Sequence, residues 1–171
     1  MRLPETFSEN KNVNAVIECP KGSGNKFTYN KENDFFSLTK VLPSGTSFPL
    51  DFGFIPHTLA ADGDPLDILV VSEFPTFTGC IIESRIIGAM LCEQKEKKQK
   101  PYRNDRIIAV ANESLIYSDL HEIVSLNKNH LNEIIHFFEY YNQMRGKKFK
   151  FLRSINKKKT MQLIKQHIKN Y

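Results

Sequence analysis

An acidic turn runs directly into a short apolar segment in the sequence DGDPLDILVV, residues 62–71. Residues 68–71 form a continuous apolar run bounded by turn residues, which predicts a strand buried on both faces. The three carboxylates of the turn repel one another by about 1 kcal/mol or more for each close pair. A fold tolerates such repulsion when cations bind there or when protons are shared. Because oxygen ligands suit hard cations, the turn is a candidate site for magnesium, manganese or calcium, with Asp67 held rigidly at the start of the strand.

The same residues also allow two other interpretations, a solvated acidic turn and a calcium loop. A solvated acidic turn is common, and the D-x-D pattern alone leaves that interpretation open. A calcium loop of the EF-hand type also begins D-x-D, and Glu73 falls at its twelfth position. However, Leu66 and Asp67 stand where that loop needs an oxygen ligand and a glycine, Pro65 intervenes, and a strand follows instead of a helix. The pattern therefore argues against a calcium loop.

Short β-branched or alternating segments separated by turn residues fill the first two thirds of the chain. They predict strands at residues 13–19, 27–29, 35–42, 68–71, 80–90 and 107–110, with a possible bulge at Gly88. In the last third, apolar residues at steps of three and four predict a helix over residues 131–141, with Asn127 or Asn129 as its cap. A second apolar stripe predicts a shorter helix over residues 161–168. The pattern predicts an α+β protein, a small β-barrel or sandwich with helices on its outside.

The composition narrows the class of protein. The chain has 171 residues, is 40% hydrophobic and carries a net charge of +5, so residues 1–171 are expected to form one globular domain. The positive charge allows a nucleic acid, an anionic membrane surface or a small polyanionic substrate as partner. We expect a cytoplasmic protein without a membrane partner, because no apolar run reaches about 18–20 residues and no signal peptide precedes the domain.

The cysteines and two of the basic segments point to no further site. The three cysteines are far apart and form no C-x-x-C pair, which argues against a disulfide framework or a cysteine zinc site. The basic residues of the segment 95–103 predict an exposed loop or hairpin tip, and the run at residues 157–159 predicts a solvated turn before the last helix.

The acidic turn and its surroundings resemble a known family. Residues 48–59 and 62–70 look like the core of the soluble, magnesium-dependent (family I) inorganic pyrophosphatases, and the six-residue acidic motif is that family's signature. Residues 15–20 and 137–141 extend the likeness, which covers about residues 12–146, to a divergent member of the bacterial type. The resemblance implies a five-stranded, OB-like β-barrel flanked by C-terminal helices. It also implies hydrolysis of pyrophosphate to two orthophosphates by a metal-activated water, and a homo-oligomer, which in short bacterial chains is a hexamer.

The resemblance also implies roles for individual residues. Two neighbouring cations can neutralise pyrophosphate and activate a water, while positive side chains hold the phosphoryl oxygens. Mg²⁺ is the expected cofactor, with Mn²⁺ or Zn²⁺ as substitutes. Asp62 and Asp67 would hold the metal, Glu18 would complete the acidic floor, and Asp64 would orient or deprotonate the water. The residues implied to contact phosphate are Lys26, Lys40, Arg106 and Tyr141. A role for Lys147 and Lys148 stays open, because in the resemblance they lie just after the substrate-contacting helix.

Several positions depart from the bacterial pattern. A family glutamate is replaced by Thr28, an arginine by Lys40, a tyrosine by Phe52, a lysine by Arg106, a metal-binding aspartate by Asn104 and a lysine by Asn142. The missing metal ligand could be supplied by Asp105, which we expect, or by Glu93. These changes leave open a relative that binds phosphate compounds but hydrolyses pyrophosphate weakly. An OB-like barrel could also bind single-stranded nucleic acid, but three aspartates at its mouth argue against that partner.

Overall fold

Five strands close into a small barrel in the computed structural model, which describes residues 3–97 and 99–169. They follow one another around the ring in the order β1–β4–β5–β8–β6, and β6 pairs back with β1. β5 and β8 are parallel, whereas the other neighbours in the ring are antiparallel. The five-stranded, OB-like barrel expected from the sequence is confirmed. Its strands are β1 (Val13–Cys19), β4 (Asp51–Phe54), β5 (Asp67–Val71), β6 (Ile81–Lys95) and β8 (Arg106–Ala111).

The fully apolar strands are buried on both faces. In β5, Leu69 and Val71 join one hydrophobic cluster while Ile68 and Val70 join another, and β8 divides its residues in the same way. The first cluster includes Phe138 of helix α1 (Lys128–Gln143), and the second includes Ile164 of helix α2 (Lys157–His167). The continuous apolar runs of the sequence are therefore explained by helices and strands that cover both faces of the sheet.

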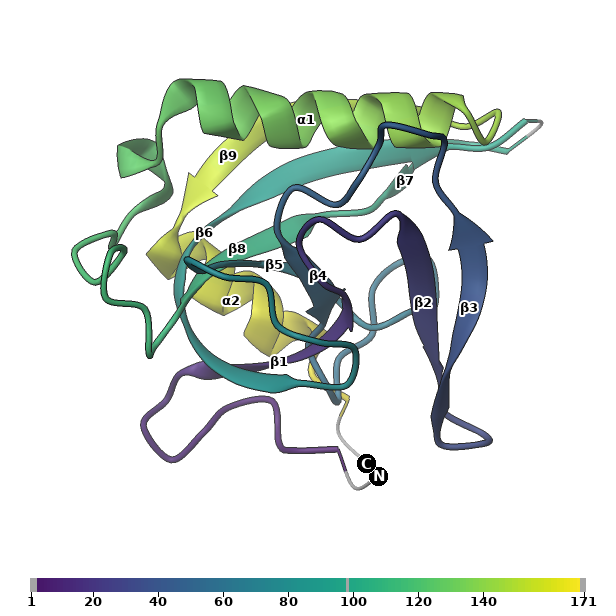
Figure 1. Ribbon diagram of the computed structural model, residues 1–171. Helices are drawn as coiled ribbons and strands as arrows, with labels where there is room; N and C mark the ends of the chain where they lie inside the picture. Colours follow the sequence, from purple (N-terminus) through teal and green to yellow (C-terminus); the bar gives the residue numbers. More distant parts are fainter. Residues whose placement is uncertain (1–2, 98, 170–171) are drawn as a thin grey trace.

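Helix α1 lies along one side of the barrel, and α2 lies on the other side of the long strand β6 (Figure 1). The side chain of Asn127 caps α1 by accepting a hydrogen bond from the N–H of Asn129 at 2.8 Å, so the first of the two expected caps is correct. A short 3-10 helix, η1 (Ile123–Ser125), precedes α1. None of the helices in the described ranges is long and apolar enough to cross a membrane.

Two hairpins extend from the barrel. β2 (Asn25–Asn30) and β3 (Phe35–Val41) form a separate two-stranded sheet that stands beside the ring (Figure 1). The long strand β6 has a bulge between Ile86 and Gly88, as expected, and its end pairs with β7 (Tyr102–Arg103). The basic segment 95–103 is therefore the tip of a hairpin; its Lys98 lies outside the described residues.

The last third of the chain is less helical than expected. Strand β9 (Lys148–Asn156) separates the two helices and pairs with β6 along nearly its whole length. Its lysines hid an apolar alternation, because Phe149 and Ile155 are buried while Lys148 and Lys150 are exposed. The lysines at residues 157–159 form the first turn of α2, capped by Asn156, instead of a turn before it. Both expectations were wrong, the first because β6 provides a pairing partner for β9 and the second because Asn156 caps a helix that begins at Lys157.

Candidate active site

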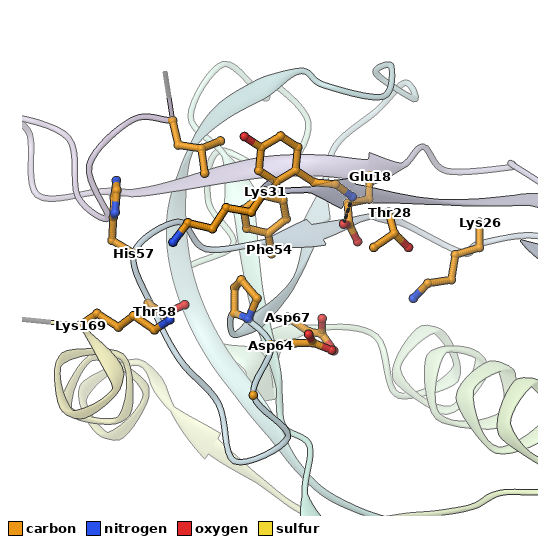
Figure 2. A pocket seen from close by; sticks show the side chains of 14 residues that line it. Glu18, Lys26, Thr28, Lys31, Phe54, His57, Thr58, Asp64, Asp67 and Lys169 are labelled. Atoms are coloured by element: carbon orange, nitrogen blue, oxygen red, sulfur yellow. Dashed lines mark hydrogen bonds between the residues drawn. The ribbon is translucent and has the colours of Figure 1, made fainter. Parts of the chain in front are cut away.

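The acidic side chains gather where three strands begin or end. Asp62 and Asp64 lie in the turn between β4 and β5, Asp67 is the first residue of β5, and Glu18 is near the end of β1. The parallel register of β5 and β8 places Asp67 opposite Arg106, and Arg106 Nη1 forms an ion pair with Asp67 Oδ2. Figure 2 shows the carboxylates of Asp64 and Asp67 directed to the same side as Lys26, with Glu18 nearby. The fold therefore brings together four of the predicted acidic residues: Glu18, Asp62, Asp64 and Asp67.

Burial makes these carboxylates costly to ionise. It raises the pKa of Glu18 to about 7, although the charge of Lys26 and a 2.8 Å hydrogen bond from the N–H of Tyr29 act in the opposite direction. Burial likewise raises the pKa of Asp67 in spite of the neighbouring Arg106, and it raises the pKa of Asp62. The negative charge of this group is thus only partly compensated by the protein, and a bound cation would stabilise the ionised forms.

The pKa of Glu18 predicts a pH-dependent stability in metal-free protein. A carboxyl with a higher pKa when folded binds more protons in the folded than in the unfolded state, so the free energy of unfolding falls as pH rises from 4.5 towards about 7. Over this window we expect the wild type to lose about 3 kcal/mol more than Glu18→Gln, which lacks the titrating carboxyl at this position. Urea unfolding with a chelator at pH 4.5 and 7.5 measures the difference. Parallel pH profiles for the two proteins would contradict the prediction.

Cations and aromatic rings lie beside these carboxylates. Lys26 and Lys40 face each other as register partners of the β2–β3 hairpin. The ammonium nitrogen of Lys26 lies 5.2 Å from the ring centre of Phe52, and the guanidinium carbon of Arg106 lies 4.9 Å from that of Phe138. Such contacts favour a positive charge over the ring face. Phe52 has no hydroxyl to donate, but its ring face stabilises the positive charge of Lys26.

The acidic, cationic and aromatic side chains together line one cleft of about 370 Å³. Seven of the nine predicted site residues line it: Lys26, Lys40, Asp62, Asp64, Asp67, Arg106 and Tyr141. An eighth, Glu18, lines an adjoining cleft of about 320 Å³, shown in Figure 2, that shares Lys26, Asp64 and Asp67 with the first. The acidic turn is thus open to both clefts.

The ninth residue, Asp105, is engaged elsewhere. Its Oδ1 accepts a hydrogen bond from the N–H of Cys92 at 2.8 Å and pairs with Arg103 Nη2 at 2.6 Å. Asp105 and Glu93 are not among the described residues that line the two clefts, whereas Asn104 is. The structure therefore does not bring Asp105 to the acidic turn, because side chains alternate across this extended segment and the even-numbered ones face the cleft.

Five further polar or charged side chains line the cleft that were not predicted from the sequence. Asn104 donates from Nδ2 to Gln94 Oε1 at 3.1 Å, so two neutral amides line the cleft near Arg106. Spacing could have found Arg145, which is four residues, about one helical turn, beyond Tyr141. The others come from two hairpins whose placement is tertiary. The five are Thr39, Gln94, Glu96, Tyr102 and Arg145, and Lys147, for which the sequence left a role open, also lines the cleft.

The donor set decides which cation the site could hold. Asp62, Asp64 and Asp67 offer carboxylate oxygens only, which suit a hard divalent cation. Within the described residues, no three His, Cys, Asp or Glu side chains already converge as a metal site. The chemistry therefore fits a divalent cation, and the carboxylates would have to close around it.

The chain forms a closed OB-like barrel, and its cleft combines the carboxylates of an acidic turn with cationic side chains. These features define a class of enzyme suited to phosphoryl transfer. The family model described as inorganic pyrophosphatase matches residues 15–171. An inorganic pyrophosphatase of Halalkalibacterium halodurans is 42% identical over 141 residues, which is 82% of this chain and 83% of the relative. One from Synechocystis is 36% identical over 159 residues, covering 93% and 91%.

Solved structures agree with the sequence relatives. The crystal structure of inorganic pyrophosphatase from Thermus thermophilus superposes with a TM-score of 0.88 and is 36% identical, covering 97% of this chain and 94% of that one. The Helicobacter pylori enzyme gives a TM-score of 0.88 at 28% identity, covering 98% and 97%. The chain belongs to the inorganic pyrophosphatase family of hydrolases.

Proposed function

We propose that this chain hydrolyses inorganic pyrophosphate to two orthophosphates in a Mg²⁺-dependent reaction at the cleft described above. One observation carries the proposal: in a member of this family, the acidic turn lines a single cleft together with Lys26, Lys40 and Arg106. Pyrophosphate carries about three to four negative charges near neutral pH, so it needs both cationic side chains and metal ions to be attacked by water.

Asp62 and Asp67, with Glu18 behind them, are the residues that would hold Mg²⁺. When bound, the cation neutralises phosphoryl charge and lowers the pKa of water. The raised pKa values of Glu18, Asp62 and Asp67, each caused first by burial, support a cation at this position. Mn²⁺ and Zn²⁺ are the substitutes to compare.

The chain's own residues supply the remaining chemistry. Asp64 is exposed in the turn and accepts the proton of the attacking water. Arg106 is held in place by its ion pair with Asp67 and by the ring of Phe138, and with Lys26 it holds the phosphoryl oxygens as charge develops. Lys40 and the hydroxyl of Tyr141 bind the other phosphoryl group.

Removal of divalent metal tests the proposal directly. With Mg²⁺ we expect phosphate release from pyrophosphate at about 1–10³ per second, and with a chelator we expect release to fall to the background rate. Readdition of Mg²⁺ should restore the rate, and Mn²⁺ and Zn²⁺ should be compared at equal concentration. No turnover with any of the three metals would contradict the proposed activity.

A weaker activity is the second candidate. It is favoured by the pair of neutral amides, Gln94 and Asn104, where the resemblance implies a further carboxylate. A neutral pair would bind an additional cation less tightly than a carboxylate. Calorimetry with imidodiphosphate, a non-hydrolysable analogue, separates binding from turnover. A turnover number within the ordinary range would eliminate this candidate.

We further propose a homo-oligomer, with a hexamer implied by the resemblance. Exposed apolar side chains of Phe74, Leu115 and Ile116 support this, since the side chain of Glu73 holds the backbone N–H groups of residues 115 and 116 and keeps these loops together. Light scattering that gave the mass of one chain would contradict it. The cytoplasmic location and the absence of a nucleic-acid partner stay predictions from the sequence.

A further inference from the structure

Arg145 projects into the cleft although the reasoning from sequence assigned it no role. It lies just beyond the end of α1, and its Nη1 donates a hydrogen bond to the hydroxyl of Tyr141 at 3.1 Å. Its guanidinium carbon lies 5.2 Å from the centre of the Tyr141 ring. The ring therefore orients a planar group with five donors, most of which remain available to a ligand in the cleft.

Arg145 belongs to a cationic end of the cleft, formed by Lys40, Arg145 and Lys147. Burial lowers the pKa of Lys40, and the positive charges of Arg145, Lys26 and Lys147 lower it further, so these groups are close enough to repel one another. Lys147 is paired with Glu96, but no carboxylate lies within ion-pair distance of Arg145 in the part of the chain that the structure describes. The hydrogen bond from Lys147 lowers the pKa of Glu96 and the charge of Arg145 lowers it further, but Arg145 keeps no ion-pair partner of its own among the described residues. Such a positive group in a cleft attracts a polyanion.

The acidic turn lines the same cleft beside other cations, since Asp67 forms its ion pair with Arg106. The positive charges that act on Asp67 are those of Arg106 and Lys26, and the one that acts on Glu18 is that of Lys26. Lys26 also acts on Lys40, so it lies between the acidic turn and the cationic end. A ligand with two phosphoryl groups would therefore place one beside the acidic turn and the other among Lys40, Arg145 and Lys147.

Asn142, the other polar residue of this part of α1, does not offer its donor to that second group. Its side chain is 1% exposed, and its Nδ2 donates to the carbonyl of Phe138 within the helix at 2.8 Å. Beyond Tyr141, Arg145 is thus the first side chain of this segment that can donate to a ligand.

We propose that Arg145 binds the phosphoryl group farther from the acidic turn and thereby sets the affinity of the cleft for a two-phosphate ligand. The inference rests on the proposed function for the identity of the substrate. The guanidinium fork makes charge-assisted, bidentate contacts to phosphoryl oxygens, which an ammonium group cannot reproduce. Because the contact does not involve the attacked phosphorus, it strengthens substrate binding more than it accelerates the chemical step.

The variants Arg145→Gln and Arg145→Lys test the inference against Arg153→Gln, which removes one exposed arginine outside the cleft. Two quantities are measured with Mg²⁺: KM and kcat for pyrophosphate, and the dissociation constant of imidodiphosphate by calorimetry. For Arg145→Gln we expect KM and the dissociation constant to rise about tenfold or more, with a much smaller change in kcat. Arg145→Lys should recover part of the loss, and Arg153→Gln should behave as wild type.

The outcomes separate this inference from the proposed function. If Arg145→Gln binds imidodiphosphate as tightly as the wild type and Arg153→Gln do, the inference is wrong even when pyrophosphate is hydrolysed. If the wild type shows no turnover, the proposed function fails, and the dissociation constants still decide the role of Arg145. A variant that melts at a lower temperature but keeps wild-type affinity would assign Arg145 a structural role and overturn the inference.

Discussion

Replacing Asp64 by asparagine is expected to lower the rate of phosphate release by about 10²–10⁴-fold at saturating pyrophosphate and Mg²⁺. The substitution keeps the shape of the side chain but removes the only proton acceptor that the proposed mechanism gives to the attacking water. Asp64 is exposed and lies in a turn that lines both clefts, so replacing its carboxylate should leave the fold intact. The rate is measured by phosphate release, and the fold by circular dichroism and thermal unfolding.

Asp119→Asn is the matched control for this prediction. Asp119 is also an exposed aspartate, but it lies outside the residues that line the two clefts, so its variant should hydrolyse pyrophosphate at the wild-type rate. If Asp64→Asn retained more than about one tenth of the wild-type rate, a role for Asp64 as the proton acceptor would be untenable. A reduced rate in both variants would point to net charge as the cause.

Gly53→Ala is expected to have the largest effect on stability, about 3 kcal/mol or more in the free energy of unfolding. Gly53 lies in β4 opposite Ile17 of β1, where the two strands approach closely. A Cβ atom at this position would stand 2.0 Å from the carbonyl oxygen of Val16 and 2.8 Å from its carbonyl carbon. Because both atoms belong to the backbone of a fully buried strand, neither can move without disturbing the ring.

Gly24→Ala provides the comparison. Its added Cβ would meet only the carbonyl oxygen of Thr46, at an ordinary 3.7 Å, so we expect a change within about 0.5 kcal/mol. Urea unfolding of both variants and of the wild type gives the two differences. Equal stability of Gly53→Ala and Gly24→Ala would show that β1 and β4 are farther apart than described here. Pyrophosphate hydrolysis by any folded Gly53→Ala protein would report whether the β4–β5 turn keeps its place.

The cleft combines a complete acidic turn with neutral amides beside it. Asp62, Asp64 and Asp67 are together, whereas amides stand at Gln94 and Asn104. Arg106 donates to the side-chain oxygen of Asn104 and pairs with Asp67, so it links the amide pair to the acidic turn. The number of cations bound at equilibrium is therefore the measurement that would best relate these substitutions to activity.

The sequence alone determined the two strands buried on both faces and the centre of the site for local reasons, whereas the closed barrel followed from the family resemblance. Residues 68–71 and 107–110 are apolar without alternation, and only strands covered on both faces need such a pattern. The acidic turn is six residues long, so its carboxylates are neighbours in any fold that keeps the turn. Lys26, Arg106 and Tyr141 could be named because they match a family motif at fixed distances along the chain.

Only the tertiary structure decided which side chains outside the motif enter the cleft. Asn104 and Asp105 are neighbours in sequence, yet the pairing of β6 with the segment after β7 directs Asn104 into the cleft and Asp105 to the N–H of Cys92. Strand β9 exists because β6 is long enough to offer it a hydrogen-bonding edge, and that pairing holds the turn carrying Arg145 at the cleft. Side-chain direction in an extended segment changes with a shift of one residue, and the shift is set by a distant partner strand.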